Sequence, residues 1–211
     1  IEDAAEALGS WYGGRHCGTM GTLGILSFNG NKTITTGGGG MIITNDEDLA
    51  KRAKHLTTTA KVDHPWDYMH DAVGYNFRMP NLNAALGCAQ MEKLENLLAR
   101  KKEQAVKLRE CLEEGEGLEV VSPDTGEANH WLNLVRVPDQ DRDEILNGLN
   151  KKGIQARVSW KPLCDMPPYR DYEQFEVHVA RELYASVICL PNGVLAGSPR
   201  NTGNRMEGLG T

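Results

Sequence analysis

Lys32 is the residue of this sequence whose surroundings best suit chemistry. It follows the apolar residues 24–28 and precedes residues 35–40, which end in four consecutive glycines. A lysine on a tight loop at a strand end is held rigidly and partly desolvated, which frees its amine as a nucleophile. Such an amine can form a Schiff base with an aldehyde. The alternative is an ordinary surface lysine, as most lysines are.

The glycine run at residues 37–40 admits two interpretations. Consecutive glycines could cradle a phosphate, as in a P-loop nucleotide-binding module. However, residues 30–33 read Gly-Asn-Lys-Thr, which is not the P-loop order, and the glycines lead into an expected strand. The P-loop module is therefore a minor alternative. The glycines are better explained as room for a close backbone approach beside Lys32.

Asp3 is the second candidate, because a carboxylate followed by small residues is typical of a strand end that opens into a helix. A buried aspartate needs a cationic partner. In a pyridoxal phosphate (PLP) site that partner is the protonated ring nitrogen, which lets the ring act as an electron sink. The alternative, that Asp3 only caps a helix, is favoured by its position alone.

The composition is that of an ordinary globular chain. Its 211 residues are 40% hydrophobic and 25% charged, with a formal net charge of -6. Length allows one large domain or two small ones. No Lys/Arg cluster indicates nucleic-acid binding, and no apolar run is long enough for a membrane helix. The five cysteines are widely spaced, which argues against disulfides and zinc, favours a cytoplasmic protein and leaves them as packing residues.

Strands that alternate with helices predict an α/β fold. Residues 24–28 and 41–44 are expected to be strands, followed by a helix from residue 45 to about 56. Residues 57–80 are expected to be irregular. One long helix is predicted next, with Asn81 as its N-cap and an end near residue 112. Beyond it we expect strands at 118–121, 131–137 and 154–158, and helices at 141–152 and 175–186.

The pattern divides the chain into four segments. They are residues 1–80, the C-terminal part of a larger domain; 81–117, a connecting helix; 118–192, a smaller α/β domain; and 193–211, a disordered or atypical tail. The first segment is too short to complete a sheet, and the chain begins with Ile1 rather than Met. We therefore expect a truncation at the front, and a truncation or frame change at the back.

Three motifs resemble those of the DegT-type sugar aminotransferases. They are EDAAEALGS at residues 2–10, SFNGNKTITTGGGGMIITND at 27–46 and HDAVGYNFRMPNLNAALGCAQMEKL at 70–94. The resemblance covers residues 1–192. It implies a fold-type I, PLP-dependent enzyme whose PLP-binding large domain includes residues 1–80. It also implies a homodimer with shared active sites.

Matched residue by residue, the resemblance implies a set of roles. Lys32 forms the Schiff base and moves the proton between substrate C4 and cofactor C4′. Asp3 binds the pyridinium nitrogen, and Glu6 lies near the ring hydroxyl. Ser27 binds the cofactor phosphate, and Asn76 reaches the phosphate of the neighbouring subunit. Because related sugar dehydratases carry His at the lysine position, Lys32 favours transamination.

Residues 153–172 resemble the branch of the family that acts on UDP-linked 4-keto-6-deoxy N-acetylhexosamines. Arg157, Trp160 and Lys161 could contact the nucleotide or the sugar, or form a plain surface turn. Cys164 stands where the branch usually has His, and Val158 where it often has Pro, changes that could alter the sugar pocket. The usual amino donor of the family is glutamate.

The sequence therefore predicts an aminotransferase that converts a nucleotide-linked 4-keto-6-deoxy sugar to its 4-amino sugar. PLP is the expected cofactor, and a nucleotide sugar and an amino acid are the expected partners, with no metal. The 211-residue chain alone is expected to be inactive. The alternative hypothesis is an incompetent fragment or paralogue that acts as a binding protein. His70 and Tyr75 are further candidates, although such residues more often pack.

Overall fold

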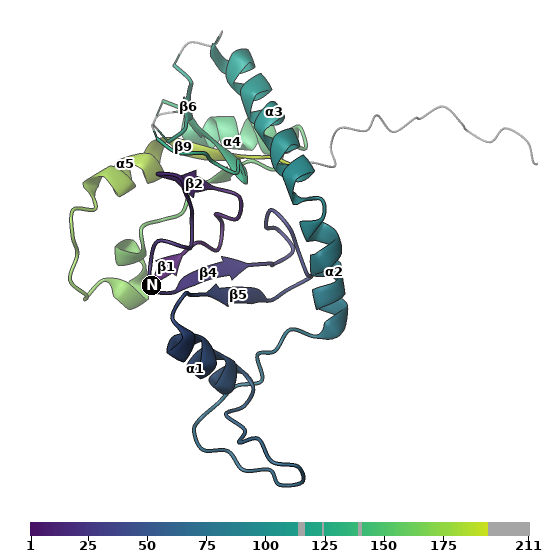
Figure 1. Cartoon of the computed structure of the whole chain (residues 1–211). Helices are drawn as coiled ribbons and strands as arrows, with labels where there is room; N and C mark the ends of the chain where they lie inside the picture. The colour runs from purple at the N-terminus through teal and green to yellow at the C-terminus, as the bar shows by residue number, and fades with distance from the viewer. Residues whose placement is uncertain (114–116, 124, 139–140, 194–211) are drawn as a thin grey trace, which may run out of the picture.

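The computed structural model describes residues 1–113, 117–123, 125–138 and 141–193. Two larger sheets, a short hairpin and a pair of consecutive helices organise this part of the chain (Figure 1). The predicted α/β fold is confirmed. The expected tail lies outside the described residues apart from Gly193. No helix among the described residues is long and apolar enough to cross a membrane.

The first sheet has three strands in the order β1–β4–β5. β1 (Glu2–Asp3) pairs in parallel with β4 (Gly24–Ser27), and β5 (Gly40–Ile43) pairs with β4 in the antiparallel direction. The predicted strands at residues 24–28 and 41–44 are confirmed to within one residue. Residues 4–10 form turns, so the helix expected after Asp3 is wrong.

The glycine run provides a close backbone approach within this sheet. A Cβ added at Gly40 would lie 2.6 Å from the carbonyl oxygen of Leu26, and Gly37 and Gly39 have φ of 80° and 101°. These positive φ angles strain residues with a side chain. The expectation of a close backbone approach is correct, and the backbone approached is that of β4.

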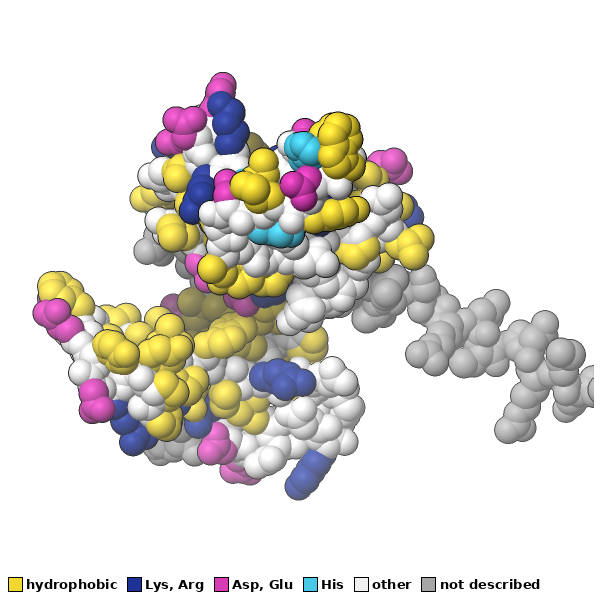
Figure 2. All heavy atoms as spheres, turned by 90° about the horizontal axis from the view of Figure 1, so that it is seen from below, with side chains coloured by type: hydrophobic (Ala, Val, Ile, Leu, Met, Phe, Trp, Pro, Cys, Tyr) yellow, Lys and Arg dark blue, Asp and Glu magenta, His cyan; other side chains and the backbone are white. Residues whose placement is uncertain are grey.

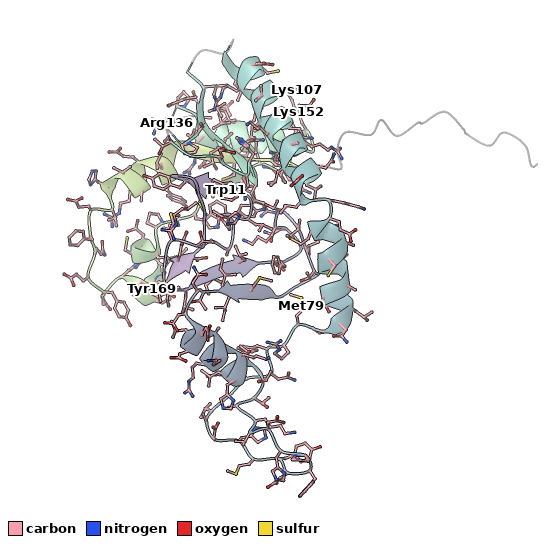
Figure 3. All side chains as sticks on the ribbon, in the orientation of Figure 1. Trp11, Met79, Lys107, Arg136, Lys152 and Tyr169 are labelled. Carbon is pink, nitrogen blue, oxygen red and sulfur yellow. The ribbon has the colours of Figure 1, made fainter. Side chains whose placement is uncertain are left out.

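A hairpin joins the first sheet to the second half of the chain. Its strands β2 (Trp11–Tyr12) and β3 (Arg15–His16) are connected by two glycines with positive φ, as a tight hairpin turn requires. Trp11 exchanges two backbone hydrogen bonds of 2.8 Å with Glu127. Figure 3 shows Trp11 between the two larger sheets.

Helix α1 (Glu47–Thr57) begins where its sequence predicts. Asp46 is the N-cap, and its carboxylate accepts the N–H groups of Asp48 and Leu49 at 3.0 and 2.9 Å. Residues 58–80 then form an irregular arm that extends below α1 (Figure 1). Its base is held by the bridge between Thr58 and Asn76.

The long helix predicted from residue 81 is two helices, α2 (Asn81–Met91) and α3 (Leu94–Glu113). At the break, the N–H of Lys93 donates to the carbonyl of Gln90 at 3.1 Å, a tighter i to i+3 turn. Pro80 rather than Asn81 is the N-cap, since proline cannot donate and fits a helix start. The unbroken apolar spacing concealed this break.

The second sheet contains four strands in the order β6–β7–β9–β8, all paired in the antiparallel direction. They are β6 (Glu119–Val121), β7 (Leu132–Arg136), β8 (Arg157–Val158) and β9 (Val187–Pro191), with helices α4 (Arg142–Lys151) and α5 (His178–Ser186) and the 3₁₀ turns η1 (Leu163–Asp165) and η2 (Pro167–Tyr169). The sequence reading missed β9, a central strand, because α5 runs into it without a turn.

Helix α3 spans both cores. Its N-terminal leucines, Leu94 and Leu97, pack on the first core, which contains Leu26, Phe28 and Ile34. Farther along α3, other leucines pack on the second core, formed by Val135, Val137 and Ile188. The division of the chain into four segments, with residues 81–117 as the connecting one, stays a prediction.

The five cysteines are all free thiols. Cys189 is buried, whereas Cys88 and Cys111 are exposed and Cys17 and Cys164 are half-buried. The expectation that the cysteines serve as packing residues is therefore wrong for the two exposed thiols.

Candidate active site

Four of the predicted site residues lie at or after the carboxyl ends of two parallel strands of the first sheet. Because β1 and β4 are parallel, the loops after their carboxyl ends lie on the same side. Asp3 and Ser27 end these strands, and Glu6 and Lys32 lie in the loops that follow. Lys32 Nζ donates to Glu6 Oε1 at 3.0 Å, which joins the two loops directly.

The Lys32 side chain is largely shielded from water, with an exposed fraction of 13%. Its loop is anchored by Ile34, which belongs to the first core, and by the N–H of Lys32, which donates to the carbonyl of Asn29 at 3.1 Å. The ammonium lies 4.5 Å from the centre of the Trp131 ring. This agrees with the expected rigid and partly desolvated lysine.

Asp3 is exposed, in contrast to the buried carboxylate that the sequence reading considered. The reason is that β1 is an edge strand of the described sheet. One carboxylate oxygen, Oδ1, accepts the N–H of Ala5 at 3.1 Å. The helix-cap alternative is wrong, because turns follow Asp3 instead of a helix. Its carboxylate can accept a further cationic donor.

Glu2 holds β1 in place beside Asp3, a role that sequence reading did not assign. Its carboxylate accepts the backbone N–H groups of Gly18, Met20 and Gly21, the last two at 2.9 and 3.0 Å. These bonds lower the pKa of Glu2, and the bond from Gly18 contributes most to the shift. The ionised form of Glu2 therefore fixes the loop that precedes β4.

Asn129 and Trp131 complete the surroundings of Lys32, and sequence reading missed both. Asn129 is 7% exposed, and its Nδ2 donates to the carbonyls of Glu6 and Leu8 at 2.8 and 2.9 Å. Its Oδ1 accepts the N–H of Trp131 at 2.9 Å. Trp131 Nε1 donates to the carbonyl of Asn31, directly before Lys32. No sequence motif predicts these contacts, because the bonded residues are 123 and 100 positions apart in the sequence.

Trp160 is the one of the three substrate candidates that the structure connects to this site. Its ring stacks on Trp131 with centroids 5.9 Å apart and an interplanar angle of 27°. Arg157, in β8, and Lys161 lie on the surface. Both tryptophans also line a groove of about 630 Å³ together with Glu6. The groove therefore borders Glu6 and Trp131, the two side chains that contact Lys32 Nζ.

The groove has a basic side. Lys102 and Arg109 of α3 and His130 contribute to its lining. Burial lowers the pKa of His130, and the nearby charges of Lys102, Arg109 and Lys101 lower it further. His130 is therefore expected to be neutral in the native protein near neutral pH.

Asn76 lies in the arm rather than at the sheet edge. It is exposed and pairs with Thr58. The other arm candidates make local contacts: the His70 ring bonds to the carbonyl of Thr59 at 2.8 Å, and Tyr75 stacks on Phe77 at 5.0 Å. These contacts support the packing interpretation of His70 and Tyr75.

Comparison with known proteins identifies the family. Residues 1–197 match the model of the DegT/DnrJ/EryC1/StrS aminotransferase family, and the chain belongs to this family. The chain is 37% identical over 193 residues to GDP-perosamine synthase of Escherichia coli O157:H7, a match that covers 91% of this chain and 52% of that protein. The chain spans about half the length of the curated relatives it matches.

Solved structures show the same fold. PseC of Helicobacter pylori, an aminotransferase of pseudaminic acid biosynthesis, superposes with a TM-score of 0.85 at 25% identity, covering 92% of this chain and 54% of that chain. Spr1654 of Streptococcus pneumoniae in its PLP-form gives a TM-score of 0.79 at 27% identity, covering 90% and 51%. This chain is similar in fold to both proteins.

Proposed function

We propose that the protein is a PLP-dependent aminotransferase that converts a nucleotide-linked 4-keto-6-deoxy sugar to its 4-amino sugar, with glutamate as amino donor. The main support is the shielded Lys32 amine, bonded to Glu6 at the carboxyl edge of two parallel strands. Family membership and relatives named for sugar amination support the reaction class. Residues 153–172 favour a UDP-linked N-acetylhexosamine as the first substrate to test.

The residues at the sheet edge fit PLP. Lys32 offers an amine, Asp3 an exposed carboxylate and Ser27 a hydroxyl, from loops and strand ends on the same side. When bound, PLP supplies the electron sink that lets an amino group pass between two carbonyl carbons. Lys32 would hold PLP covalently and move a proton at Nζ as general acid and base. Asp3 would hold the ring nitrogen, and Ser27 the phosphate.

Glu6 and Asn76 have more specialised proposed roles. Glu6 accepts a hydrogen bond from Lys32 Nζ, so its carboxylate orients the amine at the edge where Asp3 lies. Asn76 would reach the phosphate bound by a second subunit, as its place in an exposed arm allows. The arm also exposes Trp66, Tyr68 and Phe77 at 81%, 78% and 71%, apolar surface that a homodimer would cover.

The remaining assignments follow from the same proposal. Residues 1–80 would belong to the PLP-binding large domain and residues 118–192 to the small domain, joined by the segment that contains α2 and α3. Arg157, Trp160 and Lys161 would face the nucleotide sugar, with Trp160 supported by its stack on Trp131. The free thiols support a cytoplasmic location.

The test is trapping of PLP on Lys32. The protein expressed from its complete reading frame is mixed with PLP, reduced with borohydride and digested for peptide mass spectrometry. We expect a stoichiometric adduct on the Lys32 peptide in the wild type and in the surface control Lys51→Ala, and no adduct at that site in Lys32→Ala. A folded wild type that yields no adduct would favour the binding-protein alternative. Product formation from glutamate and UDP-, GDP- or TDP-linked 4-keto sugars then identifies the nucleotide.

A further inference from the structure

Trp131 makes two distinct contacts with the Lys32 loop. Its ring face lies 4.5 Å from Lys32 Nζ, within the range of a cation–π interaction. Its Nε1–H donates to the carbonyl of Asn31, one residue before Lys32. A single rigid side chain therefore contacts both the backbone of the loop and the amine at the tip of the lysine.

Trp131 is itself held by contacts from its backbone and from its ring. Its backbone N–H donates to Oδ1 of the buried Asn129, and its ring stacks on Trp160. Asn129 in turn bonds to the carbonyls of Glu6 and Leu8. The same asparagine therefore links the backbone of Trp131 to the backbone of the segment that carries Glu6.

We propose that Trp131 is a positioning residue for Lys32, an inference that rests on the proposed function. The lysine side chain has four rotatable bonds, so without lateral contacts its amine would sample many directions. Glu6 on one side and the indole face on the other restrict the amine to the sheet edge. Trp160 and Asn129 act through Trp131.

The hold depends on the charge of the lysine. A protonated Nζ is attracted by the Glu6 carboxylate and by the negative face of the ring, whereas a neutral amine loses the cation–π attraction. Trp131 and Glu6 therefore hold the protonated amine more strongly than the neutral amine, which can still donate an N–H to the Glu6 carboxylate. A residue that only packed against the loop would restrict both forms equally.

Competitive labelling tests this inference without the cofactor or the reaction. The cofactor-free protein from the complete reading frame is treated with trace acetic anhydride, and the acetylation rate of Lys32 is divided by that of Lys51. We expect this ratio to rise about three- to tenfold in Trp131→Leu and less than about twofold in Trp131→Phe, which keeps an aromatic face. The control Phe175→Leu, an aromatic side chain that is 85% exposed and lies outside the arm, should leave the ratio unchanged.

A second measurement avoids the risk that Trp131→Leu fails to fold. Replacement of tryptophan throughout the protein by a polyfluorinated tryptophan weakens the ring quadrupole at nearly constant shape, and should raise the same ratio. An unchanged ratio in folded Trp131→Leu or in the fluorinated protein would overturn the proposal. In the active enzyme, Trp131→Leu should lower kcat about tenfold and leave KM for the nucleotide sugar within about twofold.

The two proposals fail in different ways. If the wild type forms no PLP adduct and aminates no sugar, the proposed function is wrong, but the labelling ratio still reports whether Trp131 holds Lys32. If transamination occurs and the ratio does not respond to Trp131, the positioning role alone is refuted.

Discussion

Asn129 is the residue whose removal should damage the candidate site most clearly. Asn129→Ala deletes three well-formed hydrogen bonds: two donated to the carbonyls of Glu6 and Leu8 at 2.8 and 2.9 Å, and one accepted from the N–H of Trp131 at 2.9 Å. Asn129 is 7% exposed, so water replaces few of these contacts. At about 1 kcal/mol for each lost bond, the free energy of unfolding should fall by about 3 kcal/mol.

The assay is urea unfolding followed by circular dichroism. With a slope of about 2 kcal/mol per molar urea, a loss of about 3 kcal/mol lowers the midpoint by about 1.5 M. The matched control is Asn147→Ala, an exposed position in α4, which should change stability by less than about 0.5 kcal/mol. Because both variants replace Asn by Ala, the difference in stability between them reports the hydrogen bonds of Asn129.

Asn129→Asp separates hydrogen bonding from packing. Aspartate has nearly the same volume and keeps an acceptor for Trp131, but it presents oxygen instead of an N–H group to the carbonyls of Glu6 and Leu8. We therefore expect Asn129→Asp to be at least as destabilising as Asn129→Ala. Stability within about 0.5 kcal/mol of the wild type in Asn129→Asp would refute the hydrogen-bond reasoning.

Two further predictions concern titratable groups. Because backbone N–H groups lower the pKa of Glu2, its ionised form stabilises the fold above about pH 4.3, the ordinary glutamate value, and this contribution is lost as pH falls through the lowered pKa. Glu2→Gln should therefore be less stable near neutral pH and lose less stability on acidification, as urea unfolding at several pH values would show. Burial raises the pKa of Cys189 to about 11, so near pH 8 its thiol should react at least about tenfold more slowly with a maleimide than exposed Cys88 and Cys111, measured by peptide mass spectrometry.

Local patterns in the sequence predicted the parts of the structure that neighbouring residues determine. Asp46 caps α1 as its acidic surroundings indicate, and the apolar run before Lys32 forms β4. The apolar spacing after Pro80 predicted a helix, but could not show the break before Leu94, because apolar residues recur at roughly helical spacing on both sides of it.

The surroundings of Lys32 could be predicted only in part. Its rank as the leading candidate came from its place after a strand, and the pairing with Glu6 follows from two parallel strands with adjacent loops. Asn129 and Trp131 belong to a loop before β7 whose residues show no periodicity. Their contacts bridge 123 and 100 residues of sequence, so only the tertiary structure brings them to the site.

Part of the surface beside the first sheet is apolar and exposed to solvent among the described residues. Figure 2 shows hydrophobic side chains on two lobes with a hollow between them. The lining of a groove beside β4 and β5 includes Met41 and Ile42, which are 49% and 45% exposed. These exposed apolar side chains are available for contact with other polypeptide.

Lys32 also depends on the second sheet. Trp131 directly precedes β7, and Val135 within β7 belongs to the second core. A shift of β7 would move the indole ring against the amine, while Glu6 would stay with the first sheet. The packing of α3 against both cores sets the spacing between these two groups. Substitutions deep in the second core should therefore change the labelling of Lys32, although none of those residues contacts it.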